Sequence, residues 1–165
     1  MWHFDPLTWR IQQYCELEMR GMEEREYIPL LAEEMQVDEN LMADILKAPY
    51  WDSSVACSAM TVLGVEVPAY EDDKPYRYSC EEEAREAAAC LDCHVDTQQI
   101  GEYYMLTNQV WYSVTKRTCG RGMLCLGCVE NRLGRTLMPD DFRTGVPINE
   151  GYFPRSERFV DRMGR

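Results

Sequence analysis

The sequence lacks most features of membrane, secreted and histidine-dependent catalytic proteins. It contains no run of about 18 apolar residues, so we expect no membrane span. Its first residues lack the basic and apolar stretches of a secretory signal, so we expect a cytoplasmic protein. Only His3 and His94 could supply an imidazole, and no nucleophile-elbow, phosphate-loop or zinc-protease motif occurs. We therefore expect a protein that is not an enzyme, and no small-molecule substrate is evident.

Positive charge is scarce in the first half of the chain. The 165 residues carry a net charge of −12. Residues 1–89 contain 7 Lys and Arg against 20 Asp and Glu, whereas residues 90–165 contain 10 against 9. The first part would repel nucleic acid and the second would not. This asymmetry indicates two modules.

Residues 1–68 are expected to form a helical domain. Apolar residues recur at helical spacing in four stretches, which are 7–22, 24–36, 39–47 and 54–63. Asp38 stands where the third helix needs an N-cap, Asp52-Ser53-Ser54 can cap the fourth, and Gly64 stands where the fourth would end. Residues 69–78 are expected to be a linker, because Pro68, Pro75 and three consecutive acids fall within 68–78.

Two cysteine pairs dominate the expected second domain, residues 79–143. Four of the eight cysteines form Cys90-Leu-Asp-Cys93 and Cys125-Leu-Gly-Cys128, with 31 residues between the pairs. Two such pairs close a tetrahedral thiolate site, so we expect one structural Zn²⁺. Four thiolates leave no open position for catalysis. Three cysteines plus water would instead indicate a metal-dependent enzyme.

The region around these pairs predicts an α+β fold class. Residues 100–106 and 109–115 are rich in Tyr, Val, Trp and Thr, which favours a β-hairpin with its turn at 107–108. An alanine-rich helix capped by Ser79 precedes the first pair, and a helix over 126–133 begins at the second. Residues 144–165 are expected to be a tail that could be flexible until it meets a partner, with one short helix over 154–162.

The helical domain resembles the Cro- and lambda-repressor-like helix-turn-helix family over residues 8–68. The resemblance rests on Leu30-Leu-Ala-Glu-Glu-Met-Gln-Val37, Leu41-Met-Ala-Asp-Ile-Leu-Lys47 and Val62-Leu-Gly-Val65. It implies a recognition helix over 39–47, in which Asn40 and Lys47 would contact DNA. The chain departs from the family at Gln36, where a small or glycine residue is usual, and in the acidity of that helix. A helical bundle for protein contact is therefore the alternative.

The second domain has the layout of a treble-clef zinc finger, which is a knuckle, a hairpin and then two cysteines that open a helix. Its segments 100–105, 122–135 and 140–142 also resemble small uncharacterised proteins of actinobacteria and their phages. This resemblance implies zinc binding and a phage or actinobacterial origin, and hence a host cytoplasm for a phage protein. It implies no activity.

Arginines surround the expected zinc turn. With nearby aromatic residues, Arg117, Arg121, Arg132 and Arg135 could bind nucleic acid, or they could simply be solvated. We therefore expect a small zinc-binding regulatory protein that acts on a macromolecule, either a host protein or DNA. One alternative is an acidic DNA mimic that inhibits a DNA-binding protein, and a last alternative is a metal-dependent enzyme.

Overall fold

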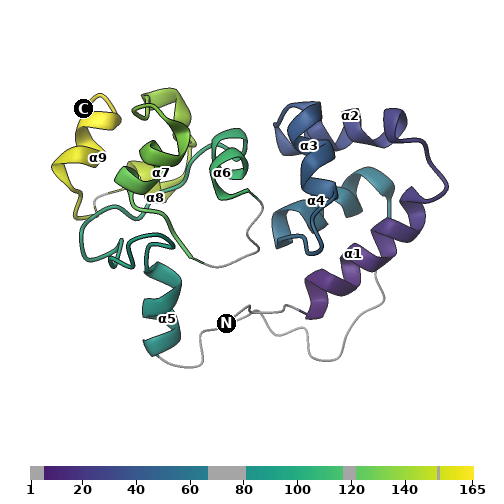
Figure 1. The fold of residues 1–165 in the computed structure, drawn as a ribbon, viewed down its shortest axis with the longest axis horizontal. Coiled ribbons are helices and arrows are strands. Elements are labelled where there is room, and N and C mark those ends of the chain that lie inside the picture. Colours follow the sequence, from purple (N-terminus) through teal and green to yellow (C-terminus); the bar gives the residue numbers. More distant parts are fainter. Residues whose placement is uncertain (1–5, 67–80, 117–121, 152) are drawn as a thin grey trace. The chain divides into compact units, whose positions relative to one another are not determined.

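The regular secondary structure of the described residues consists of helices. The computed structural model covers residues 6–66, 81–116, 122–151 and 153–165 (Figure 1). Within these ranges the only β-type pairings are isolated bridges, so the expected α+β class was wrong. The chain divides into two compact units, which we describe separately. The first contains α1 to α4, and the second contains α5, α6 up to Val114, and α7 to α9.

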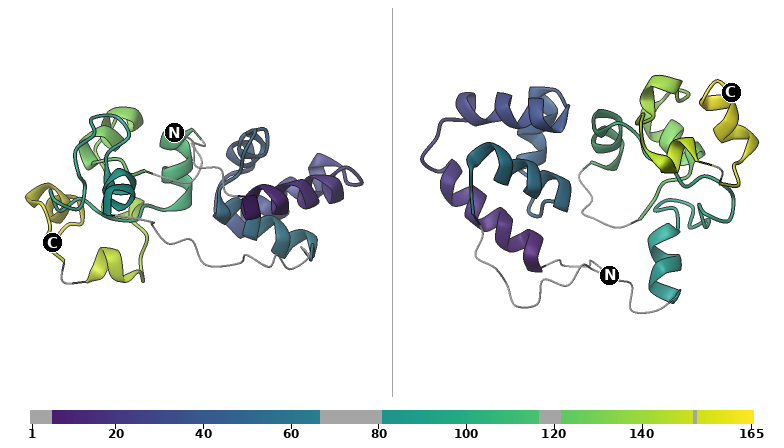
Figure 2. Two further views of the ribbon diagram at one scale, coloured as in Figure 1. Left: turned by 90° about the horizontal axis from the view of Figure 1, so that it is seen from below. Right: turned by 180° about the vertical axis from the view of Figure 1, so that it is seen from behind.

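The first unit is a bundle of four helices. They are α1 (Pro6–Met19), α2 (Glu24–Met35), α3 (Glu39–Leu46) and α4 (Ser53–Leu63), and Figure 2 shows them from two further sides. Helix α4 contacts α1 and α2, and α3 contacts α2. The buried side chains recur at helical spacing on each helix, and they include Ile11, Cys15, Leu31, Met35, Met42, Ile45, Val55 and Ala59.

Helix ends in this unit follow the capping residues expected from the sequence. The Asp38 side chain accepts a hydrogen bond from the Leu41 amide at 2.8 Å, and Asp52 accepts one from Val55 at 3.0 Å. Gly64 adopts φ 62°, a left-handed conformation that suits glycine, and ends α4. The N-caps expected for α3 and α4 are thereby confirmed.

A buried glutamine ties α1 to the segment before α4. Gln12 is 2% exposed, and its side-chain oxygen accepts a hydrogen bond from the Trp51 amide at 2.8 Å. Its side-chain nitrogen donates to the Pro49 carbonyl at 3.2 Å and to Glu16 at 2.8 Å. Buried polar groups need such partners, so this residue fixes the register of α1 against the rest of the bundle.

The turn between α2 and α3 places a glutamine in a glycine conformation. Gln36 has φ 56° and ψ 47°, and its amide donates to the Ala32 and Glu33 carbonyls. A left-handed residue other than glycine costs about 1–2 kcal/mol, whereas glycine loses about 0.5–1 kcal/mol more backbone entropy on folding. Because Gln36 is exposed, we expect Gln36→Gly to stabilise the first unit by about 0.5–1 kcal/mol.

This expectation can be measured as an upward shift of the denaturation midpoint. Gln36→Ala is the matched control, since alanine removes the same side chain but keeps the left-handed cost. A midpoint that fell in the glycine variant would contradict the strain that we assign to this turn.

The second unit contains a helix where the second strand of the hairpin was expected, and residues 100–106 form no strand beyond an isolated bridge from Leu106 to Phe142. Its elements are α5 (Glu81–Ala88), α6 (Asn108–Thr115), α7 (Leu126–Leu133), the short 3-10 helix η1 (Pro139–Asp141), α8 (Pro147–Glu150) and α9 (Glu157–Arg162). Residues 109–115 lie within α6, and the expected turn at 107–108 is its N-terminus. The carbonyl of Thr107 accepts from the Trp111 amide at 2.9 Å, and its hydroxyl accepts from Val110 at 3.4 Å. Leu106, Val110 and Val114 are buried at a spacing of four, which is helical.

The C-terminal residues pack into the second unit. Phe159 of α9 is 2% exposed and stacks edge-on against Phe142, with ring centroids 5.5 Å apart. Arg155 donates to the carbonyls of Tyr103 and Ile148, and the Ser156 amide donates to the Gly101 carbonyl. Residues 144–165, apart from 152, therefore form part of the folded unit without a partner. The expected helix over 154–162 is confirmed over Glu157–Arg162.

Two expectations concern residues that the structure does not describe. They are the linker at 69–78 and the helix cap at Ser79. Among the residues that are described, no helix is both long and apolar enough to cross a bilayer.

Candidate metal centre

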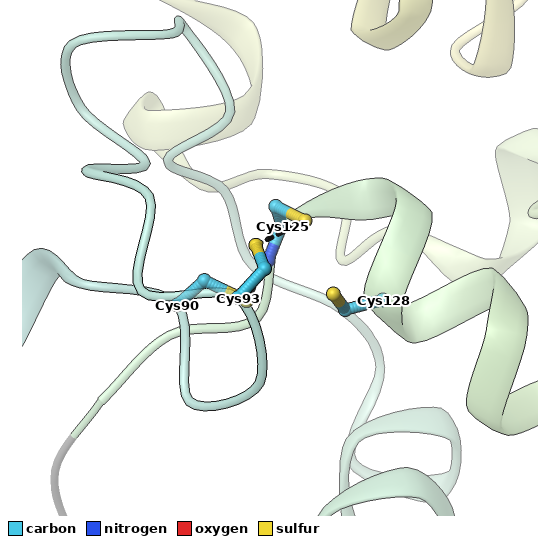
Figure 3. Close-up of side chains that lie close together, drawn as sticks. All are labelled: Cys90, Cys93, Cys125 and Cys128. Carbon is cyan, nitrogen blue, oxygen red and sulfur yellow. Dashed lines mark hydrogen bonds between the residues drawn. The ribbon is translucent and has the colours of Figure 1, made fainter.

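The first cysteine pair sits in a tight turn directly after α5. The Cys90 amide donates to the Val95 carbonyl at 2.8 Å, and the His94 amide donates back to the Cys90 carbonyl at 2.9 Å. His94 takes φ 61°, which lets the chain reverse right after Cys93. The two thiols of the pair therefore sit on one small loop and reach the same point (Figure 3).

The second pair opens helix α7. Cys125 is the N-cap residue and Cys128 lies in the first turn (Figure 3). The chain reaches this position beside the first pair, because the Leu91 amide donates to the Met123 carbonyl at 2.8 Å. Gly122, at φ 110°, permits this approach, since a Cβ there would lie 2.4 Å from a Leu91 methyl. A helix N-terminus also favours thiolate charge.

The four thiols converge. Their sulfur atoms all lie within 4.8 Å of one another, and Cys93 Sγ is 3.7 Å from Cys125 Sγ. Sulfurs bound to one zinc ion at about 2.3 Å lie about 3.8 Å apart, so the donor set fits this geometry. Cys90 and Cys125 are buried, Cys128 is half-buried and Cys93 is exposed. The four cysteines can thus hold a metal ion such as zinc.

Backbone amides favour ionisation of one thiol and burial opposes it at the others. Burial disfavours the Cys90 thiolate, but amide hydrogen bonds from Cys93, Cys125 and Asp92 outweigh it and lower the pKa of Cys90 to about 7. Burial raises the pKa of Cys125. Burial, and then hydrogen bonds to the other three thiols, raises the pKa of Cys128 well above its usual range. A divalent cation would bind all four as thiolates and release their protons.

A buried carboxylate supports the helix that carries the second pair. Glu102 is 3% exposed, and its Oε2 accepts a hydrogen bond from the Leu126 amide at 2.8 Å. Its Oε1 accepts from the Ser156 hydroxyl at 3.3 Å and lies 3.8 Å from Arg158 Nη1. Glu102 therefore holds the first turn of α7 and links it to α9. Sequence reasoning missed this residue, because it stands among aromatic residues in a stretch assigned to a strand.

The apolar surroundings of the cysteines form the core of the second unit. The Tyr104 hydroxyl donates to the Leu124 carbonyl at 2.6 Å, one residue before Cys125. Leu124, Leu126 and Val129 are fully buried. The metal site is thus continuous with the core rather than an appendage on its surface.

Two of the arginines expected to contact nucleic acid form ion pairs within the unit. Arg132 binds Asp92 through two hydrogen bonds of 2.9 and 2.6 Å. Arg135 binds Asp141 through two of 2.6 and 2.8 Å, which lower the pKa of that carboxyl. Arg117 and Arg121 lie outside the described residues.

The two α3 candidates lie on the first unit. Asn40 is exposed in the first turn of α3, and Lys47 is the C-cap residue. The Lys47 ammonium lies 3.8 Å from Asp44 in an exposed ion pair. Neither residue belongs to the unit that holds the cysteines.

Known proteins give no guide to the metal centre, so its interpretation rests on its own geometry. Searches against protein-family models, curated proteins and solved structures found no match to this chain.

Proposed function

We propose that the chain is a small zinc-binding regulatory protein that acts by binding another protein. The zinc serves structure, because four thiolates fill the four positions of a tetrahedral ion and leave none for a substrate or a reactive water. The function then rests on the surfaces of the two units. This assigns no catalytic step to the chain.

The acidic charge of α3 is the observation that favours a protein partner over DNA. In the helix-turn-helix resemblance this helix would enter the major groove, where Lys and Arg contacts to phosphate supply most of the affinity. Its exposed residues include Glu39, Asn40 and Asp44, and Lys47 is paired with Asp44. An acidic helix suits a partner with a basic surface.

The ion pairs of the second unit support the same choice. Arg132 and Arg135 would have to leave Asp92 and Asp141 before they could contact phosphate. Breaking a bidentate pair offsets part of what a phosphate contact would contribute.

The test combines DNA titration with capture of a host protein. We expect the full-length protein to show no salt-dependent binding to mixed-sequence duplex DNA between 50 and 200 mM salt, a range over which proteins with several phosphate contacts lose about 10³–10⁵ in affinity. A host protein retained by the wild type should be lost by Glu39→Lys/Asp44→Lys. It should be kept by Glu18→Lys/Glu66→Lys, which makes the same charge change elsewhere on the unit.

Two results would contradict this function. One is DNA binding that weakens steeply with salt. The other is equal loss of the captured protein in both charge-reversal variants, since a general charge effect would then explain the capture.

A DNA mimic is a second candidate within the same class. The observation in its favour is that α2 also exposes acids, including Glu26, Glu33 and Glu34, so the acidic surface extends beyond α3. A mimic should be displaced from its partner by duplex DNA, whereas a protein bound at another site should not be.

A further inference from the structure

One ion pair joins the two halves of the metal centre. Asp92 lies between Cys90 and Cys93, and Arg132 lies on α7, four residues after Cys128. Arg132 Nε donates to Asp92 Oδ2 at 2.9 Å and Nη2 donates to Oδ1 at 2.6 Å. This bidentate ion pair, or fork, therefore joins the segments that carry the two cysteine pairs. Its two members are 40 positions apart in the sequence.

A third hydrogen bond fixes the guanidinium. Arg132 Nη1 donates to the carbonyl of Val114, near the end of α6, at 2.8 Å. The Arg132 side chain is 29% exposed and that of Asp92 is 33% exposed. The planar guanidinium makes three hydrogen bonds. They restrict the rotation of the first cysteine turn relative to α7 more than a single contact would.

We propose that Asp92 and Arg132 are positioning residues of the metal centre. In the folded unit they hold the two cysteine pairs at the separation that a tetrahedral ion requires, and so they stabilise the metal-bound state. The inference rests on zinc binding by the four cysteines, as in the proposed function, and does not depend on whether the partner is a protein.

The second unit offers a matched control for this pair. Arg135 and Asp141 form a fork of the same chemistry, with hydrogen bonds of 2.6 and 2.8 Å. Its members are six residues apart and lie after α7, so the pair joins no two parts of the metal centre. Its removal disturbs the unit without separating the cysteine pairs.

The experiment measures zinc affinity of the full-length protein by competition with a chromophoric chelator. We expect Asp92→Asn and Arg132→Gln each to weaken zinc binding about tenfold, at the lower end of the 10–100-fold seen for outer-shell partners, because the pair is partly exposed. The double variant should be little weaker than either single one, since both remove the same interaction. Arg135→Gln and Asp141→Asn should stay within about twofold of the wild type.

Two further readouts separate positioning from general destabilisation and from charge. Cobalt substitution should show altered thiolate-to-metal and d–d absorption bands in Arg132→Gln but not in Arg135→Gln. Arg132→Lys keeps the charge without the fork, so it should bind zinc as weakly as Arg132→Gln.

The outcomes distinguish this inference from the proposed function. Wild-type zinc affinity in Asp92→Asn and Arg132→Gln, full affinity in Arg132→Lys, or an equal loss in the Arg135 control would each overturn the positioning role and leave the zinc site standing. Absence of zinc binding in the wild type would overturn the zinc site and this role together.

Discussion

Removal of zinc by a chelator is expected to unfold the second unit and leave α1 to α4 folded. Cys90 and Cys125 are buried within the core of the second unit, and the described backbone around the first cysteine pair is joined by isolated bridges rather than by a sheet. Structural zinc contributes about 10–16 kcal/mol in small finger peptides, and small domains bury a smaller fraction of their surface on folding than large ones do, so they gain most from such help. The first unit has its own buried core and takes no residue from the cysteine cluster.

Amide-resolved NMR of the full chain measures this directly. Signals from the second unit should collapse into the unfolded range after chelation and return when zinc is added. Signals from residues such as Leu31, Met42 and Val55 should keep their positions. Cys57→Ser, which removes an exposed thiol outside the cluster, should respond to chelation as the wild type does. Retention of the folded spectrum of the second unit without metal would contradict a structural role for the ion.

Phe159→Ala is expected to destabilise the second unit by about 3–5 kcal/mol, as is usual for a buried phenylalanine. The ring is 2% exposed and lies 5.5 Å from the Phe142 ring and 6.3 Å from the Tyr104 ring, measured between centroids. The Arg155 guanidinium lies 4.5 Å from its centroid. The cavity would open between α9 and the rings of Tyr104 and Phe142.

The matched control is Phe153→Ala, in the same C-terminal stretch. Phe153 is 56% exposed, so its truncation should change stability by no more than about 0.5 kcal/mol. The midpoint temperature of thermal unfolding of the second unit, measured on the zinc-loaded protein, should fall by more than about 12 °C for Phe159→Ala. A unit of this size loses about 4–8 °C per kcal/mol. Equal effects of the two substitutions would show that the C-terminal helix does not contribute to the core.

The cluster of four cysteines that could hold a metal ion was predictable from the sequence, because its signal is local. Two residues between cysteines bring both thiols of a pair to one side of a turn, and no other chemistry explains two such pairs as simply. The caps Asp38 and Asp52 and the terminator Gly64 were predictable for the same reason. Each acts on amides within a few residues of itself.

The hairpin prediction was wrong because it followed the amino-acid composition of residues 109–115 and not the spacing of their apolar residues. Residues 109–115 have the β-branched and aromatic content of a strand, but Leu106, Val110 and Val114 recur every four residues. Thr107 is a helix N-cap rather than a turn residue, and its hydroxyl accepts from Val110. Tertiary burial of one helical face decided the outcome.

The groups that support the site could not be predicted from local patterns. Glu102 meets Leu126 across 24 residues, and Asp92 meets Arg132 across 40. Arg132 and Arg135 seemed available for nucleic acid because their acidic partners are not neighbours in a helical or turn pattern. Only the folded chain shows that their charges are already paired.

The most direct test of the metal centre is the zinc content of the purified full-length protein, measured by elemental analysis beside Cys125→Ser/Cys128→Ser. We expect one zinc ion per chain in the wild type and none in the variant, whose second unit should also lose its folded structure. No zinc in the wild type, or zinc retained in the variant, would contradict binding by Cys90, Cys93, Cys125 and Cys128.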